Sequence, residues 1–345
     1  MPRHCPTGRL DPSEPAMETI DIHTHLLAPG VRFDRLFDRV SVSLFARRLG
    51  QDPRALSADP YGVYRETMAR LIGASRHVRQ AVLFGVDARC DEQGREVHRD
   101  RTVCTDNEAV WDTASRYPGA FIPFFSINPL RQDALERIDA YAERGFRGAK
   151  FLQNYWGLDL NQERFLPYYE RLRTHRLPLI VHIGMEYTIE SKAACEAVRM
   201  VDLPVAAGVT VIAAHMGLGQ LTGPRWPWGV LSRNPRWFGP DYFGLLERLE
   251  RYPNLYADLS AMLVPFKARA LRHLSEQRQV HHKLLFGTDY PVPFTVVLNT
   301  HDLPLARRRE IARIDNPFDR YCAVLLEYFP EDSLVYSNHA KVLPA

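Results

Sequence analysis

The chain has 345 residues, enough to bury a large core in one domain or in two ordinary ones. Its formal net charge is +3, and its 44 Lys and Arg residues are interspersed with 41 Asp and Glu residues, so nothing in the charge pattern indicates a nucleic-acid partner. No segment approaches the roughly 18 apolar residues of a membrane span, and the five cysteines lie far apart without a C-x-x-C pair, which favours a reducing cytoplasm.

The chain begins with a polar, proline-rich segment, MPRHCPTGRLDPSEPAME. It lacks the apolar stretch of a signal peptide. We expect residues 1–17 to form a loose tail and residues 18–345 to form one domain.

From Glu18 onward, short apolar segments alternate with longer segments whose apolar residues recur every three or four positions. This alternation predicts strand–helix units around a parallel sheet that is covered on both faces. The predicted strands are residues 19–23, 80–86, 120–127, 147–152, 177–184, 209–215, 254–260 and 283–289. Eight such units predict an α/β fold closed into a TIM (β/α)8 barrel.

Helical patterns separate these strands, at residues 63–75, 105–117, 133–145, 163–175 and 242–252. Two connections are long, residues 31–60 and residues 221–240. Both follow strand C-termini, so we expect them at the catalytic face as lids or pocket walls, or else as packing and subunit-contact segments. Three further helical patterns, at residues 303–314, 316–329 and 332–343, are expected to add C-terminal helices that cap the barrel.

The first predicted strand runs into the sequence IDIHTH, which holds two histidines two residues apart. Side chains alternate between faces along a strand, so we expect Asp21, His23 and His25 to share one face. Two imidazoles on one face are able to hold one metal ion.

Polar residues also lie toward the ends of other predicted strands: Lys150 in the fourth, His182 in the fifth, His215 in the sixth and Asp289 in the eighth. In a barrel all strand C-termini meet at one mouth, so these residues are expected to become neighbours. Each has a structural alternative, such as a hydrogen-bonded histidine or, for Asp289, a cap for the turn at Pro291. Their placement at the same end of several strands favours a nitrogen- and oxygen-ligated site for a divalent ion such as zinc.

These motifs resemble those of the amidohydrolase superfamily, in particular its amidohydrolase-related branch of metal-dependent hydrolases and aminocarboxymuconate-semialdehyde decarboxylase-like enzymes. IDIHTH is similar to the first-strand metal motif of this superfamily, IVHIG to its fifth-strand histidine segment, AAHMG to its sixth-strand segment and LLFGTDYP to its eighth-strand aspartate motif. The resemblance runs from about Glu18 to Leu343 and includes the final YSNHAKVL.

The resemblance implies that His23, His25, His182 and Asp289 hold one divalent ion, for which zinc is the first choice and Mn, Fe or Co the alternatives. It implies that His215 acts beside a metal-activated water as an acid, as a base or as a polariser of the substrate oxygen. Asp289 is also placed to accept the proton of that water.

Two further residues take expected roles from the resemblance. Asp21 would support a ligating histidine from the second layer of the site. Lys150 lies where some members bridge two metal ions with a carboxylated lysine, and His215 would then bind the second ion. In other members a lysine at this position holds substrate as an ammonium. We favour a single ion.

The expected function is metal-dependent hydrolysis of an amide, lactone or ester bond in a small substrate, either cyclic or aromatic. The first alternative is a metal-dependent, non-oxidative decarboxylase of an aromatic or unsaturated carboxylic acid, because the same ion would stabilise developing charge. The alternative of another class is a catalytically inactive, ligand-binding barrel. The expected partner is a small molecule rather than nucleic acid or a membrane, and the sequence leaves a homodimer open.

Overall fold

The computed structural model describes residues 17–31, 52–100, 103–186, 189–219 and 232–343. Most of the predicted N-terminal tail, and much of both long connections, therefore lie outside the described residues. No helix in the described part of the chain is long and apolar enough to cross a membrane.

Each of the eight predicted strands corresponds to a strand of the structure, although most of the observed strands are shorter. The observed strands are β1 (Thr19–His25), β2 (Val78–Phe84), β3 (Arg89–Cys90), β4 (Glu96–His98), β5 (Phe121–Phe124), β6 (Ala149–Phe151), β7 (Leu179–His182), β8 (Val211–Ala214), β9 (Leu255–Asp258) and β10 (Leu284–Leu285). The short antiparallel hairpin of β3 and β4, which follows β2, was not predicted.

Eight of these strands form one parallel ring in the order β1-β2-β5-β6-β7-β8-β9-β10. Parallel ladders join β1, β2 and β5 into one sheet and β6 to β10 into another. Two seams join the sheets: Lys150 N donates to Phe125 O at 2.8 Å, and His25 N donates to Tyr290 O at 2.8 Å. A parallel bridge lies at each seam. The predicted TIM barrel is therefore confirmed.

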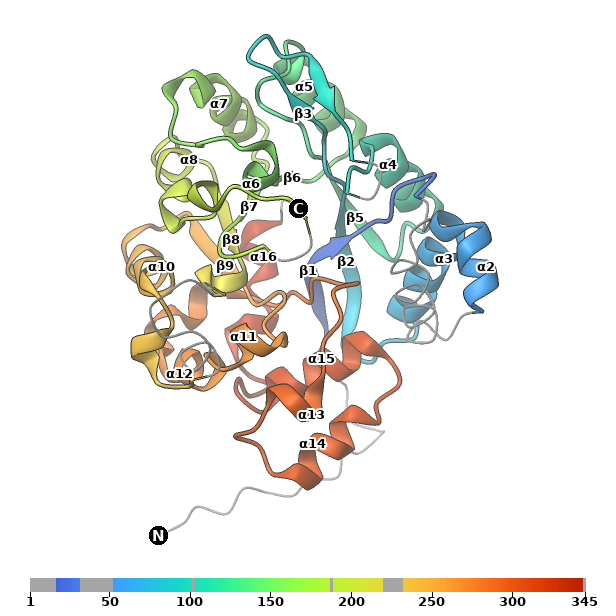
Figure 1. Ribbon diagram of the computed structural model, residues 1–345, viewed down its shortest axis with the longest axis vertical. Coiled ribbons are helices and arrows are strands. Elements are labelled where there is room, and N and C mark those ends of the chain that lie inside the picture. The colour runs from blue at the N-terminus through green and yellow to red at the C-terminus, as the bar shows by residue number, and fades with distance from the viewer. Residues whose placement is uncertain (1–16, 32–51, 101–102, 187–188, 220–231, 344–345) are drawn as a thin grey trace.

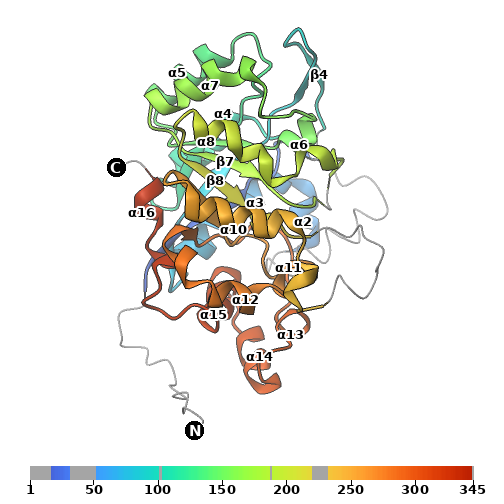
Figure 2. The same ribbon diagram turned by 90° about the vertical axis from the view of Figure 1, so that its left-hand side faces the viewer.

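Helices cover the outside of the ring (Figure 1), and Figure 2 shows α7, α8, α10 and α12 following one another down one side. The helices are α2 (Pro53–Ala58), α3 (Pro60–Gly73), α4 (Asn107–Arg116), α5 (Ala134–Arg144), α6 (Gln153–Trp156), α7 (Leu166–Thr174), α8 (Asp202–Ala206), α10 (Pro240–Arg251), α11 (Pro265–Ala268), α12 (Leu271–Glu276), α13 (Val296–Asn299), α14 (Leu305–Ala312), α15 (Pro317–Leu326) and α16 (His339–Val342). The predicted C-terminal helices are present as α14, α15 and α16, and α2 lies inside the first long connection.

Local sequence explains where the main helices begin. The Asp59 side chain accepts a hydrogen bond from Gly62 N at 2.8 Å at the start of α3, and Pro60 occupies the first turn, where no backbone donor is needed. Asn316 and Pro317 start α15 in the same way.

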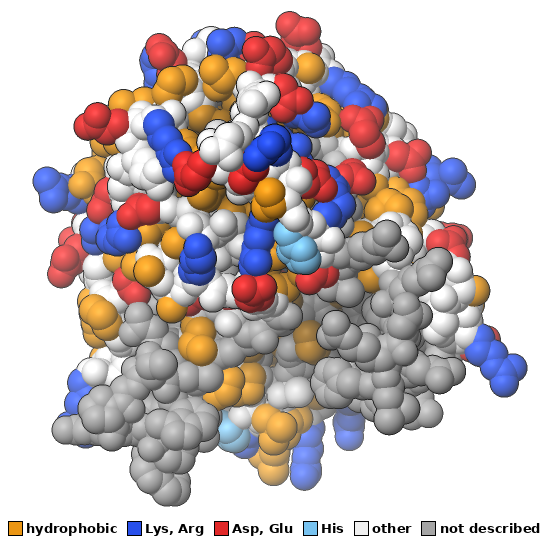
Figure 3. Space-filling view, turned by 45° about the horizontal axis from the view of Figure 1, so that its top comes forward, with side chains coloured by type: hydrophobic (Ala, Val, Ile, Leu, Met, Phe, Trp, Pro, Cys, Tyr) orange, Lys and Arg blue, Asp and Glu red, His pale blue; other side chains and the backbone are white. Residues whose placement is uncertain are grey.

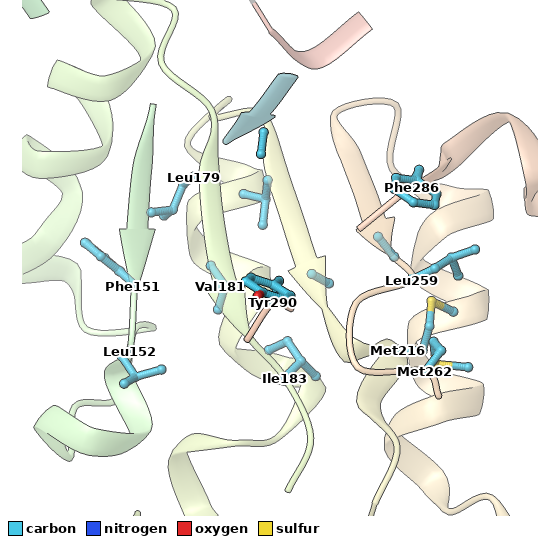
Figure 4. Close-up of a cluster of buried hydrophobic side chains, with 14 of the residues drawn as sticks. Phe151, Leu152, Leu179, Val181, Ile183, Met216, Leu259, Met262, Phe286 and Tyr290 are labelled. Carbon is cyan, nitrogen blue, oxygen red and sulfur yellow. The ribbon is translucent and has the colours of Figure 1, made fainter. Parts of the chain in front are cut away.

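Buried side chains form two clusters, one on each side of the strand ring. The outer cluster lies between strands and helices, and Figure 4 shows Leu179 and Val181 of β7 within it. The inner cluster consists of Ile22, Val82, Phe84, Phe124, Ile180, Ile212, Ala214, Leu285 and Val342. Along β7, Ile180 points inward between its outward neighbours, so the next inward position is His182. The alternation of side chains along β7 that fills the barrel interior therefore also places His182 at the mouth of the barrel.

The surface carries both signs of charge. Figure 3 shows basic and acidic side chains next to one another over the described part of one face. This mixture agrees with the small net charge of the sequence.

Candidate metal centre

A bulge in β1 determines which side chains enter the barrel. Between Asp21 and Thr24 the pairing with β2 shifts, so that β1 contains one extra residue. A bulge of this kind breaks the regular alternation of side chains. Ile22 belongs to the inner cluster, and the ring of His23 also packs on Phe84 of that cluster, with 4.9 Å between ring centroids. The prediction that Asp21 and His23 share a face is therefore wrong.

Asp21 is buried and supports the backbone of the site. Its carboxylate accepts hydrogen bonds from His23 N at 3.0 Å, from Thr288 N at 3.0 Å and from Thr288 Oγ1 at 2.5 Å. Burial raises the pKa of Asp21 from 3.8 to about 7. Asp21 thus ties β1 to the segment before Asp289, and it supports His23 through the backbone rather than through the ring.

His23, His215 and Asp289 form a compact group at the mouth of the barrel, which we call the triad. One potential ligand atom from each lies within 4.8 Å of the others, and all three side chains are buried. His23 belongs to β1, His215 begins the short 3-10 helix η4 (His215–Gly217) after β8, and Asp289 follows β10. Residues remote in sequence therefore meet at one point, as predicted.

The hydrogen bonds of His23 leave one of its nitrogens facing a carboxylate. Nδ1 lies 2.7 Å from Asp258 Oδ2, so Nδ1 is the nitrogen that donates and Nε2 presents its lone pair. Nε2 lies 3.3 Å from Asp289 Oδ1, which is also 3.1 Å from His25 Nε2. No described donor points at this buried oxygen with hydrogen-bonding geometry. Electron-rich atoms arranged in this way fit a bound cation, so the residues present suit a divalent metal.

Asp258, at the end of β9, orients two of the histidines and was missed by the sequence analysis. Besides holding His23, its carboxylate accepts hydrogen bonds from His215 N at 3.2 Å and from Ser260 N at 3.1 Å. Ser260 Oγ donates to the same carboxylate and lies 2.8 Å from His215 Nδ1. Burial acts to raise the pKa of Asp258, but its contacts with His23 and Ser260 lower the pKa below its usual value. Its only signal in the sequence is that of a single acidic residue near the end of the predicted strand 254–260.

Two triad residues have an unfavourable backbone conformation. His215 and Asp289 each have a φ of 65°, in the left-handed region that favours glycine. Such a conformation costs roughly 1–2 kcal/mol in a residue with a Cβ atom. The surrounding contacts must hold it in place, which is common at functional sites.

His25 and His182 lie beside the triad. The His25 side chain is 30% exposed and contacts Asp289 as described above. His182 Nε2 lies 3.0 Å from Gly184 O, and the His182 ring centroid is 4.8 Å from that of His215. The structure thus brings the predicted site histidines and Asp289 to one mouth. The division into four ligands and a separate His215 stays a prediction, because His215 is close enough to serve in either role.

Lys150 of β6 is fully buried next to the triad. Its Nζ atom lies 3.4 Å from His23 Nε2 and 5.2 Å from the centroid of the Phe84 ring. Burial lowers the pKa of Lys150 to about 8. A second buried lysine, Lys267 of α11, was not predicted.

A glycine makes room for His23. A Cβ atom at Gly287 would lie 3.3 Å from the Cβ atoms of both His23 and Ser260. That separation is tighter than most real contacts, so a small residue at this position lets the histidine enter the barrel.

The ring and the triad define a TIM-barrel protein with a candidate metal centre at the mouth of the barrel. A family model described as Amidohydrolase matches residues 20–294, which is more than half of the chain. The chain therefore belongs to the amidohydrolase family.

Solved structures support the same fold. An uncharacterized TIM-barrel protein from Bordetella bronchiseptica is 17% identical, with 94% of this chain and 98% of that chain covered and a TM-score of 0.57. An amidohydrolase from Burkholderia multivorans with bound zinc is 14% identical, with 95% and 100% covered and a TM-score of 0.55. A probable 2-pyrone-4,6-dicarboxylic acid hydrolase from Acinetobacter baumannii is 14% identical, with 94% and 99% covered and a TM-score of 0.54. No curated protein matches the sequence.

Proposed function

We propose that this protein is a metal-dependent hydrolase that cleaves an amide, lactone or ester bond in a small cyclic or aromatic substrate. One observation carries the proposal: the buried Asp289 Oδ1, without a hydrogen-bond donor, faces His23 Nε2 at 3.3 Å and His25 Nε2 at 3.1 Å. Membership of the amidohydrolase family supports the class of reaction.

We propose that a single divalent ion is held by His23, His25, His182 and Asp289. Zinc is the first choice, because imidazole and carboxylate ligands suit it and because the Burkholderia multivorans amidohydrolase of the same fold has zinc bound. When bound, such an ion lowers the pKa of a water molecule toward neutrality.

The remaining groups move and orient protons. His215 Nδ1 lies 2.8 Å from Ser260 Oγ, which fixes the ring, and 4.0 Å from Asp289 Oδ2. His215 and Asp289 therefore form the pair that takes a proton from the attacking water and returns it to the leaving group. Lys150, whose ammonium faces the same space, would hold the substrate oxygen rather than a second ion.

Metal analysis of two variants tests these roles. Protein purified without added metal is analysed for its elements and then assayed for acid release from a panel of lactones, aryl esters and amides, before and after chelation and zinc addition. We expect about one ion per chain, and turnover that chelation abolishes and zinc restores. His23→Asn should lose the ion, whereas His215→Asn should keep it and lose about 100-fold or more in kcat. Loss of the ion in both variants would make His215 a ligand.

Two outcomes would replace the proposal. Release of carbon dioxide from aromatic acids, without hydrolysis of any compound in the panel, would identify a decarboxylase. Zinc-loaded protein that binds aromatic acids but neither hydrolyses nor decarboxylates them would identify a ligand-binding barrel.

A further inference from the structure

Three lysines are buried in the described part of the chain, and their surroundings differ. The ammonium group of Lys283 donates to Tyr252 O at 3.3 Å and to Pro253 O. Lys150 contacts His23, as described above. Lys267 is only 3% exposed, yet its ammonium makes no hydrogen bond or ion pair with any other residue that the structure describes.

Lys267 lies at the mouth of the barrel. It belongs to α11, which follows the segment that carries Asp258 and Ser260. Burial lowers the pKa of Lys267, and nearby acidic groups, among them Asp289 of the triad and Asp258, act in the opposite direction. Burial lowers the pKa of His215, and the positive charge of Lys267 lowers it further. The α11 helix follows the C-terminal end of β9, where Asp258 contacts His23, so Lys267 lies on the same face of the barrel as the candidate metal centre.

The helix that carries Lys267 is firmly attached. Arg269 donates hydrogen bonds to three backbone carbonyls, Phe266 O at 2.9 Å, Ser232 O at 2.9 Å and Trp237 O at 2.8 Å. The buried Asn299 side chain donates to Leu263 O just before α11. The ammonium is therefore presented on a fixed support.

A lysine side chain that is nearly buried, and whose ammonium contacts no described hydrogen-bond acceptor, is poorly compensated for its desolvation. An anionic ligand would supply the missing contacts as a charge-assisted hydrogen bond. We propose that Lys267 binds an anionic group of the substrate, of which a carboxylate is the simplest, next to the reacting bond. That the anion belongs to a substrate rests on the proposed function, whereas the anion site itself does not depend on that function.

The alternative is that Lys267 only balances the charge of Asp289 and Glu186. In that case its removal would change stability or metal content without changing the preference for a charged over a neutral ligand. A matched pair of probes separates the two explanations.

The experiment measures the binding of benzoate and of its neutral analogue benzamide by calorimetry. It uses the full chain, both metal-depleted and zinc-loaded, as wild type, Lys267→Met and Lys267→Gln. Lys283→Met serves as the control, because it also removes a buried lysine but lies before β10, at the other end of the barrel. Circular dichroism establishes whether each variant is folded. If Lys267→Met is not folded, the binding data for Lys267→Gln decide the test.

We expect wild type to prefer benzoate in both metal states. The substitutions at Lys267 should weaken benzoate binding by about 10- to 100-fold and leave benzamide binding unchanged. Lys283→Met should keep the preference. A wild type without preference for benzoate, or Lys267 variants with an unchanged preference, would overturn the proposal.

The two proposals fail separately. A Lys267-dependent preference in metal-depleted protein, together with no hydrolysis after zinc loading, would leave the anion site standing and remove the hydrolase. Hydrolysis after zinc loading, together with Lys267 variants that still prefer benzoate to benzamide, would support the hydrolase and remove the anion site.

Discussion

A single carboxylate, that of Asp258, sets the geometry of two histidines. Asp258 accepts a hydrogen bond from His23 Nδ1, so that His23 Nε2 faces Asp289, and it also accepts one from the backbone N–H of His215. A partner of this kind fixes both the tautomer and the ring orientation of a metal ligand.

Asp258→Asn should weaken metal binding without unfolding the protein. The amide is unable to accept the His23 proton with the strength of a carboxylate, so the ring loses its fixed orientation. We expect about 10- to 100-fold weaker zinc binding, measured by competition with a chelating dye. Asp159→Asn, which alters the half-exposed contacts of Asp159 with Arg199 and Asn161, should bind zinc as the wild type does. Equal affinities in all three proteins would show that Asp258 does not position His23.

Among single residues, the sequence predicted the histidines and Asp289 because they lie together at the same end of several predicted strands. It did not predict Asp258, which lies within a predicted strand and reads there as an ordinary polar residue. Lys267 lies on a four-residue helix that has no repeating pattern. Asp21 was assigned to the wrong face because a bulge depends on how two strands pair, and the sequence of β1 alone does not reveal it.

The existence of the secondary structure elements was predicted better than the residues at which they begin and end. Runs of apolar residues bounded by Gly and Pro identified all eight barrel strands, but the last is only Leu284–Leu285, where seven residues were expected. The chain after β10, as far as Tyr290, forms backbone hydrogen bonds with β1 across the seam, but these bonds do not make a regular ladder. Strand ends depend on neighbouring strands, so local sequence could not define them.

Gly148→Ala should destabilise the contact between β5 and β6. A Cβ atom there would lie 2.3 Å from the Phe124 ring, which is fully buried in the inner cluster. Overpacking of this kind costs about 1–3 kcal/mol in the free energy of unfolding, which urea denaturation measures.

The matched control for this variant is Gly73→Ala, at the end of α3, where nothing lies within 4 Å of the added atom. It should leave stability unchanged or raise it by up to about 1 kcal/mol. A Gly148 variant as stable as this control would show that Phe124 moves aside freely.

The whole molecule is held together by contacts between the two ends of the described chain. The seam between β1 and the segment after β10 closes the barrel, and Asp319 of α15 reaches the start of β2. Its carboxylate accepts hydrogen bonds from Ser75 Oγ at 2.5 Å, from Arg76 N at 3.0 Å and from His77 N at 3.3 Å. The sequence predicted a barrel from the count of units, but not which side chains would join its ends.

Asp319→Ala should lower the free energy of unfolding by about 2–3 kcal/mol, because partly buried and buried donors would lose a charged acceptor. The exposed Asp315, four residues earlier, provides the control Asp315→Ala, which should change stability by less than about 0.5 kcal/mol. Thermal and urea unfolding of both variants measure the difference. Two variants of equal stability would show that α15 contributes little to closing the barrel.

The seam between the first and last strands has a consequence for biosynthesis. While the ribosome has yet to add residue 289, the emerging polypeptide already contains His23 and His215 but lacks the carboxylate that faces them. The triad is therefore complete only after the final barrel strand has been synthesised. Any metal binding that needs all three of its residues has to follow that point.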